Sequence, residues 1–467
     1  MIQGGESVKN RRETSRHAAN ISEIICGCAA MLKKMKRKKV TSLLLAMVLL
    51  LVLTTTQGTS LVFAESYFTD YQSVAMVGGG EVFNIGTALP AQGTNWNFEY
   101  VTHFNHNIPV GYVTVPTLFV NDGASLTITG ASGAEQNRRV VVNGTAHITL
   151  DNASIIRTGD AIRISAGTNP ATYVNTSPMM LESGANLTLT LVGDNTLAMA
   201  TGAGNRWSAG LGVPLGADLI IEGEGSLTVE GGLNAAGIGG HEGTHLSPRV
   251  SGSITINSGT INATGRGNGA GIGGGSLMQP GRITINGGDV TARGGTGGNF
   301  GGSGIGSGSS AGTTANNNAI TINGGTVTAI GGAASAGIGG GTNTSAGTIN
   351  ITSGTVTATG GSSALRGGAG IGGGDSGNGG SITITGGTIT AVGGSNNAGT
   401  SGGGAGIGSG AAMGSAPGVH SGNINITGGT ISATGGPNAQ NIGSSKDSAG
   451  IPRPGGSVTI GEGANVI

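Results

Sequence analysis

Charge and cysteine are both scarce in this sequence. Only 9% of its 467 residues are charged, and the formal net charge is zero. Binding to nucleic acid needs a basic surface, so nucleic acid is excluded as a partner. The two cysteines, Cys26 and Cys28, precede the segment interpreted below as an export signal. A mature chain without cysteine has neither disulfides nor thiolate metal sites, so its stability must come from packing.

Acidic clusters and aromatic residues are also few. No grouping of Asp and Glu supports a calcium site, so no metal or other cofactor is expected. Ten of the fourteen aromatic residues lie between residues 66 and 119. The composition therefore predicts a separate N-terminal cap over residues 65–115. The alternative for this aromatic segment is a platform on which sugar rings stack.

Glycine is abundant instead, and much of it belongs to a repeat between about residues 252 and 460. The copies follow, with substitutions, the pattern Ile-Thr-Ile-Asn-x-Gly-Thr-Val-Thr-Ala-x-Gly-Gly, then a loose Gly/Ser/Asn stretch, then Ala-Gly-Ile-Gly-Gly-Gly. The isoleucines of the last phrase are 33 residues apart at Ile272, Ile305, Ile338 and Ile371. Such a period, with length changes confined to the polar stretches, is typical of a solenoid.

The apolar phrases have the pattern of short strands. Each is too short for a helix and alternates with a period of two. In Ile382-Thr383-Ile384 the isoleucines face one side and the threonine the other, and Thr388-Ile389-Thr390 reverses that sense. Ile371, between glycines, marks a third strand. Each coil therefore has three short strands.

Stacked coils of this kind place each strand beside its counterpart, about 4.8 Å away. The rest of the coil supplies the connection that parallel strands need, and such crossovers are nearly always right-handed. The sequence predicts an all-β, right-handed parallel β-helix with three short strands per coil of about 33 residues. Gly387, Gly393 and Gly394 are expected to supply positive φ angles at its corners. Disorder is the alternative for Gly/Ser tracts, but a linker has no reason to keep Ile and Val in register.

Residues 1–64 have the pattern of an upstream segment followed by a signal peptide. A basic stretch at 33–39 precedes an apolar run at 43–53, and Val62-Phe63-Ala64 has small residues before a cleavage site. Cleavage after Ala64 predicts a secreted or cell-surface bacterial protein with no membrane contact afterwards. An uncleaved anchor is the alternative. Residues 1–30 look unlike an export sequence, so Met31 or Met35 is expected as the true start in place of Met1.

Residues 116–467 are predicted to form the β-helix, with less regular coils first. Leu126-Thr127-Ile128 and Leu187-Thr188-Leu189 are early strand phrases. At the other end, residues 457–460 and 464–467 open a new coil without the polar cap that solenoid ends need. A truncated C-terminus is therefore expected, with an anchor or further domain beyond Ile467.

One stretch resembles a known group of proteins. Residues 183–197 read Ser-Gly-Ala-Asn-Leu-Thr-Leu-Thr-Leu-Val-Gly-Asp-Asn-Thr-Leu, and residues 209–214 read Ala-Gly-Leu-Gly-Val-Pro. With the coils that follow, they resemble secreted β-strand-repeat or carbohydrate-binding-domain proteins of Firmicutes, including polysaccharide-lyase-like, cellulose-binding β-helix proteins of clostridia. The resemblance covers about residues 116–467 and implies polysaccharide binding, in some members with calcium.

The candidate carbohydrate-contact residues are aromatic and threonine side chains. Aromatic faces suit pyranose rings, which selects Trp96, Tyr100 and Trp207. Outward threonines of successive coils form a two-column grid, namely Thr326, Thr328, Thr355, Thr357, Thr388 and Thr390. The alternatives are that Thr simply suits exposed strand positions, or that the grid orders water and binds ice.

Two patterns bear on catalysis. His241-Glu242-Gly243-Thr244-His245 matches a zinc-protease pattern that requires a helix, but it lies in a repeat loop, so a solvated loop is expected. A polysaccharide lyase needs a basic residue and carboxylates, and Asp375 has no evident partner. The best cluster for such an enzyme is Arg138, Arg139, Asp151, Arg157, Asp160 and Arg163. Nothing in the sequence places these six residues on one face.

The sequence therefore favours an exported β-helix protein that binds polysaccharide of cell-wall, host or plant origin without catalysis. Many weak contacts along the coils would add up through multivalency. The first alternative is a rigid adhesin stalk, and the second is a polysaccharide lyase or hydrolase on the same fold.

Overall fold

The computed structural model describes residues 76–77, 80–86, 91–104, 112–158, 162–163, 173–174, 176–200, 207–243, 250–312, 319–364, 366–396, 402–411, 420–445 and 456–467. The chain divides into two units, Met1–Thr69 and Asp70–Ile467. The first unit lies outside the described residues, together with the predicted signal peptide and its cleavage site. Within the described residues, no helix is long and apolar enough to cross a membrane.

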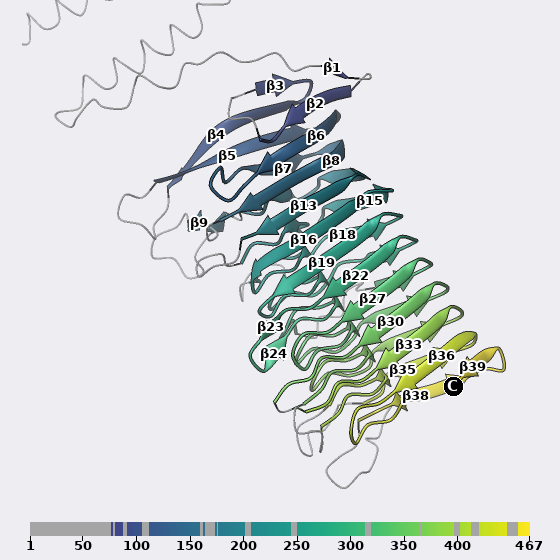
Figure 1. The fold of residues 1–467 in the computed structure, drawn as a ribbon. Coiled ribbons are helices and arrows are strands. Elements are labelled where there is room, and N and C mark those ends of the chain that lie inside the picture. Colours follow the sequence, from purple (N-terminus) through teal and green to yellow (C-terminus); the bar gives the residue numbers. More distant parts are fainter. Residues whose placement is uncertain are drawn as a thin grey trace, which may run out of the picture. The chain divides into compact units, whose positions relative to one another are not determined.

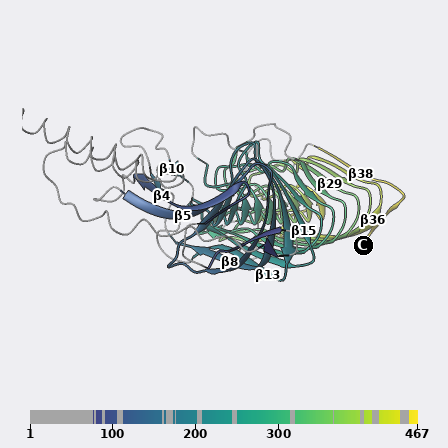
Figure 2. The same ribbon diagram turned by 90° about the horizontal axis from the view of Figure 1, so that it is seen from above.

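The second unit is a stack of coils whose strands form three parallel ladders (Figure 1). Viewed from above, the coils follow one another around a common interior (Figure 2). Each regular coil contributes one strand to each ladder, which confirms the predicted parallel β-helix with three short strands per coil.

The first ladder carries the Ile-Thr-Ile phrase. Its strands are β2 (Gly80–Asn84), β6 (Ala124–Ser132), β8 (Thr145–Arg157), β12 (Asn186–Val192), β15 (Asp218–Gly223), β18 (Ser253–Ile256), β21 (Ile283–Ile285), β26 (Ala319–Ile322), β29 (Thr348–Ile351), β32 (Ser381–Ile384), β35 (Asn423–Ile426) and β38 (Ser457–Ile460). The isoleucines stay in register from coil to coil, as in the pairing of Ile349 with Ile382.

The second ladder carries the Thr-Val-Thr-Ala phrase. Its strands are β13 (Asp194–Met199), β16 (Ser226–Leu233), β19 (Thr260–Arg266), β22 (Asp289–Arg293), β27 (Thr326–Ile330), β30 (Thr355–Thr359), β33 (Thr388–Val392), β36 (Gly429–Thr434) and β39 (Ala464–Val466). The long strand β8 joins the two ladders, because its first half pairs with β12 and its second half with β13.

The third ladder carries the Ala-Gly-Ile-Gly phrase. Its strands are β5 (Tyr112–Asn121), β7 (Arg139–Asn143), β11 (Met179–Leu181), β14 (Leu211–Gly212), β17 (Ile238–Gly239), β20 (Ile272–Gly273), β25 (Ile305–Gly306), β28 (Ile338–Gly339), β31 (Ile371–Gly372), β34 (Ile407–Gly408) and β37 (Ile442–Gly443). Their isoleucines stack directly, as Ile338 does on Ile371.

The core is a continuous column of aliphatic side chains from all three ladders. Ile382 and Ile384 are fully buried, and so is Ile371 on the third ladder. Outward residues are not buried: Thr383 is half-buried and Thr388 is exposed. This pattern of burial confirms the alternation of inward and outward residues predicted from the sequence. Burial of the aliphatic groups drives the packing of the core.

Glycine serves two different purposes in the coils, and one prediction about it is wrong. Gly387 has a φ of +95° and turns the chain from the first ladder to the second, as expected. Gly393 and Gly394 do not have positive φ angles. A methyl group at either position would instead overlap a backbone carbonyl, that of Gly404 or that of Gly361. These two residues are glycine because the backbones approach closely.

The N-terminal end closes with antiparallel strands. They are β1 (Met76–Val77), β3 (Ala91–Gly93) and β4 (Trp96–Phe104), which pair with β2, β4 and β5 respectively. Strand β5 then pairs in parallel with β7 and so starts the third ladder. Two further antiparallel pairs project from loops: β9 (Ile162–Arg163) with β10 (Tyr173–Val174), and β23 (Thr296–Gly297) with β24 (Phe300–Gly301).

Candidate functional site

The threonine grid lies on the outward side of the second ladder, in the predicted register. Thr326 pairs with Thr355 and Thr355 with Thr388, so the outer column is continuous over three coils. The inner column of Thr328, Thr357 and Thr390 is equally continuous. The outer threonines are exposed and the inner ones half-buried. Hydroxyl groups therefore repeat about every 4.8 Å along this face.

The outer column meets a charged residue at one end of the grid, whereas hydroxyl groups continue at the other end. Asp289 pairs with Thr326 and replaces the outer threonine one coil earlier. Ser432 pairs with Thr390 and continues the inner column with a hydroxyl one coil later. The surface between these two positions has no charged side chain in the two columns. It can donate and accept hydrogen bonds without attracting ions of either sign.

A row of hydrogen-bonded polar side chains runs along the turn that connects the first ladder to the second. The Asn286 amide donates to the Asn257 carbonyl oxygen at 2.9 Å, and Asn323 donates to Asn286 at 2.9 Å. Thr352 continues the row through a 3.0 Å bond to Asn323. Sequence reasoning did not single out these residues, although the Asn that follows Ile-Thr-Ile in several copies was a signal for them. Stacked amides of this kind hold the coil register.

A shallow hollow of about 640 Å³ lies at the same turn in the earlier coils. Its lining includes Thr190, Asp194, Glu224, Ser226 and Thr260. The Ser226 hydroxyl donates to Asp194 at 2.7 Å. Within the described part of the chain, no group of three His, Cys, Asp or Glu residues is placed to hold a metal ion. The lining side chains of the hollow offer hydroxyl groups and carboxylates as hydrogen-bond partners.

Comparison with protein families agrees with this geometry. Five segments match the model of a beta helix repeat, namely residues 254–276, 283–309, 320–342, 349–375 and 424–451. Each segment spans the first, second and third ladder strands of one coil. The chain is a β-helix protein that carries beta helix repeats in these five segments. Comparisons with curated proteins and with solved structures find no significant match.

The aromatic residues of the β-helix do not form one platform. Trp96 is only 2% exposed, packs edge-to-face on Phe83 at 5.3 Å, and donates its indole N–H to Glu81. Because its ring faces are covered, Trp96 is not available to stack on a sugar, and that assignment is wrong. Tyr100 is 40% exposed and remains accessible at the edge of the same cluster. Its ring centroid lies 6.1 Å from that of Phe98.

Trp207 occupies an unusual backbone position. It is half-buried and has a φ of +71°, in the left-handed region that bulky residues avoid. The equivalent positions, four residues before the third-ladder isoleucine or leucine, are left-handed at Asn234, Ala334 and Asn438. Trp207 shares this conformation with those three positions, and two hydrogen bonds hold it: Trp207 N to Leu233 O at 2.8 Å and Glu242 N to Trp207 O at 3.1 Å. Tryptophan at this position costs about 1–2 kcal/mol in backbone energy.

The described half of the zinc-protease-like motif is a buried loop. His241 is 8% exposed, and its Nδ1 accepts the backbone N–H of Ala209 at 3.1 Å. Glu242 accepts from the Asn234 amide at 3.1 Å, while His245 lies outside the described residues. The expectation of a loop is correct for residues 241–243, but the expectation that His241 is solvated is wrong. Burial lowers the pKa of His241 to about 4, so the imidazole is neutral at pH 7.

The proposed lyase cluster does not assemble as one site. Arg138, Arg139 and Arg157 are each no more than 5% exposed. Asp151, in contrast, is half-buried on β8 and accepts a hydrogen bond from the Asn152 amide at 2.7 Å. Asp160 and the side chain of Arg163 lie outside the described residues. The three arginines therefore sit apart from the one described carboxylate of the predicted cluster.

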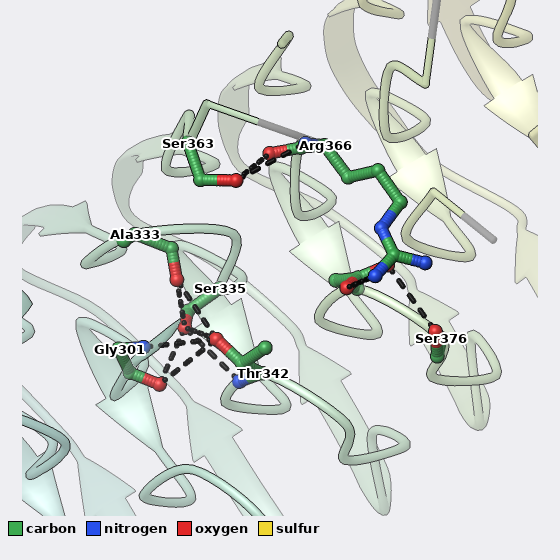
Figure 3. A network of polar contacts seen from close by, with 8 residues as sticks. Gly301, Ala333, Ser335, Thr342, Ser363, Arg366 and Ser376 are labelled. Atoms are coloured by element: carbon green, nitrogen blue, oxygen red, sulfur yellow. Dashed lines mark hydrogen bonds and ion pairs between the residues drawn. The ribbon is translucent and has the colours of Figure 1, made fainter. Parts of the chain in front are cut away.

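Asp375, for which the sequence offered no partner, forms a buried ion pair. Its carboxylate lies 3.0 Å from Nη2 of Arg366, and Ser376 donates to it at 3.2 Å (Figure 3). Burial raises the pKa of Asp375 to about 6, against the opposing effect of Arg366. The pair links the two loops that flank the third-ladder strand of this coil, so its role is structural.

One coil earlier, the same two loops meet through neutral side chains. Thr342 donates to the carbonyl of Ala333 at 2.8 Å and lies 3.1 Å from the Ser335 hydroxyl. Ser335 also donates to Gly301 of the preceding coil at 2.6 Å, and Gly301 N donates to Thr342 at 2.9 Å (Figure 3). These groups are buried, so the network holds neighbouring coils together beneath the loops.

Proposed function

We propose that the protein is exported and binds polysaccharide without catalysis, through the outward face of its second ladder. The observation that supports this proposal is the register of the threonine columns at residues 326, 328, 355, 357, 388 and 390. A polymer with repeated hydroxyl groups can meet such a face at several coils at once. Each contact is weak, and affinity arises from their number.

The uncharged face favours a polymer bound by hydrogen bonds over one bound by ionic contacts. Hydroxyl columns keep their geometry because each threonine is on a strand whose neighbours are paired above and below. Such pre-ordered groups lose little conformational entropy on binding. Trp207 and Tyr100 are the remaining aromatic candidates for contacts outside the grid.

The binding test is a pull-down of residues 65–467 on insoluble polysaccharides, with soluble products assayed in the same tubes. Retention without product release supports binding alone, and product release supports a lyase or hydrolase. The informative variant changes Thr328, Thr357 and Thr390 together to valine. Valine keeps the shape and β-propensity but removes the hydroxyl. Three lost hydrogen bonds, at about 0.5–1.5 kcal/mol each, should weaken retention by roughly 10-fold or more.

The first ladder supplies a matched control for this variant. Thr255, Thr284 and Thr321 also stack in register and are also half-buried on the outward side. Their triple change to valine should leave retention unchanged. Equal losses in both variants would contradict a role for the second-ladder face, and no loss in either would favour the rigid stalk.

Export is the second part of the proposal and rests on residues 33–64. A basic stretch, an apolar run and a small-residue cleavage site follow one another there. Expression of the full chain in a bacterial host should release a product that begins at Glu65. N-terminal sequencing of the released protein checks this directly, and a product that retains residues 43–53 would indicate an uncleaved anchor.

A further inference from the structure

Three arginines are buried close together near the N-terminal end of the β-helix. Arg139 begins β7, Arg138 precedes it, and Arg157 ends β8. The two segments lie side by side, because Asn137 accepts the backbone N–H of Thr158 at 3.2 Å. Arg157 is 1% exposed and is among the largest fully buried side chains of the protein.

Two of these guanidinium groups have identified partners. Arg138 donates to the carbonyl of Ile85 and lies over the Phe98 ring, 5.8 Å from its centroid. Arg139 donates through Nε to the Thr117 hydroxyl at 3.1 Å, and the charge of Glu182 acts on it favourably. Both cations are therefore compensated, at least in part, by groups of the protein.

Arg157 differs from both. Its Nε and Nη1 atoms are buried, and neither has a hydrogen-bond partner among the described residues. Burial, reinforced by the positive charge of Arg139, lowers the pKa of Arg157, but the group stays a cation at pH 7. Two other arginines of the coils form ion pairs within the protein: Arg266 with Glu230 at 2.6 Å, and Arg366 with Asp375.

An unpaired cation is the costliest group that a protein can bury. The free-energy cost of burying the cation falls sharply when a negatively charged group accepts hydrogen bonds from its free N–H groups. We propose that Arg157, with Arg139 beside it, binds an oxyanion. The ligand supplies oxygen acceptors to Nε and Nη1 and balances the two adjacent positive charges. This site is separate from the threonine face, so either proposal can fail without the other.

The oxyanion has two sources that share this chemistry: a free inorganic ion such as phosphate, or the carboxylate of an acidic sugar. The first experiment measures the melting temperature of residues 65–467 against inorganic phosphate and, separately, glucuronate, at constant ionic strength. Saturable stabilisation of about 3–5 °C is expected at concentrations near 100 times the dissociation constant. Phosphate alone would indicate a free ion, and glucuronate alone would indicate an acidic sugar.

The decisive variant is Arg157→Met. Without added oxyanion it should melt at a higher temperature than the wild type, since it removes an unpaired buried charge. With saturating oxyanion its advantage should disappear, because only the wild type responds. Arg266→Met is the matched control: it removes an arginine already paired with Glu230 and should keep the full response to the anion.

Two results would overturn the proposal. One is a wild type with no saturable response to either anion. The other is an Arg157→Met protein that is less stable than the wild type at every anion concentration. That result is expected if a negatively charged group of the protein itself balances the charge of Arg157. If Arg157→Met fails to fold, calorimetric titration of the wild type with phosphate and glucuronate decides the question. One-site binding to either supports the site, and no heat of binding to both refutes it.

Discussion

The guanidinium of Arg366 lies 3.0 Å from the carboxylate of Asp375, and this contact joins two loops of one coil. The loops flank strand β31 on either side, so the ion pair fixes the coil on the side away from the first two ladders. In the preceding coil Thr342 and Ser335 make the corresponding link with hydroxyl groups. The charged pair makes the stability of its coil sensitive to pH, whereas the neutral link in the preceding coil does not.

Arg366→Met should destabilise the protein by about 3 kcal/mol at pH 7.5, because it leaves the Asp375 carboxylate buried and unpaired. The loss should be smaller at pH 4.5. The folded-state pKa of Asp375, about 6, lies above its ordinary value of 3.8, so protonation contributes stability that is full below pH 4 and lost as pH rises through 6. Urea unfolding at both pH values measures the difference, and an equal loss at both would show that the carboxylate does not titrate as proposed.

His241 should make the opposite contribution to the pH dependence. Its folded-state pKa of about 4 lies below its ordinary value of 6.5. Neutral His241 therefore supports the fold fully above pH 6.5, and this support is lost as pH falls through 4. Between pH 7 and pH 4 the wild type should lose roughly 2–3 kcal/mol that His241→Gln, which keeps an acceptor for Ala209, does not lose. Parallel pH profiles for the two proteins would contradict this.

Gly372→Ala tests the close approach of backbones in the third ladder. Gly372 has a φ of +137°, and an added methyl group would overlap the carbonyl of Gly408 in the next coil. The change should cost about 3 kcal/mol or more, or prevent folding. Gly184→Ala is the control, since Gly184 has a φ of +87° but nothing within 4 Å of the added methyl. It should cost only about 1 kcal/mol through strain, measured by the same chemical denaturation.

Trp207→Asn separates stability from binding. Asparagine occupies the equivalent left-handed position at Asn234 and Asn438. The variant should therefore melt at the same temperature as the wild type or slightly higher, because the backbone strain of tryptophan is relieved. If the indole contacts polysaccharide, retention in the pull-down falls at the same time. A large drop in melting temperature would show that Trp207 is needed for packing instead.

The ladders could be predicted from the sequence because their signal is periodic. Ile382 and Ile384 alternate with threonine at the two-residue period of a strand. An isoleucine equivalent to Ile371 recurs in every regular coil. The same periodicity predicts that Thr355 and Thr388 share one column, and their pairing on neighbouring strands confirms it. Tertiary pairing in a solenoid follows from repetition, so a local pattern was sufficient here.

Burial in the loops could not be predicted in the same way. Ser335, Thr342 and His241 have the composition of solvent-facing loops, yet all three are buried. Ser335 and Thr342 contact Gly301 of the preceding coil, and His241 contacts Ala209 of its own preceding coil. No periodic feature of the sequence indicates these contacts between coils. Trp96 was misjudged for a related reason: an aromatic residue in an N-terminal segment suits both a cap core and a sugar platform, and only its contact with Phe83 distinguishes them.

The three ladders have a mechanical consequence. Among the described residues, the ladder strands of each regular coil pair only with strands of the coils before and after it, so under a force along the stack the coils should detach one after another. The molecule should then lengthen in discrete steps under tension, each releasing one coil of about 33 residues. A released coil of that size adds roughly 110 Å of extended chain. Regular sawtooth peaks at that interval would mark the β-helix as an extensible molecular spring, with each coil acting as a separate element.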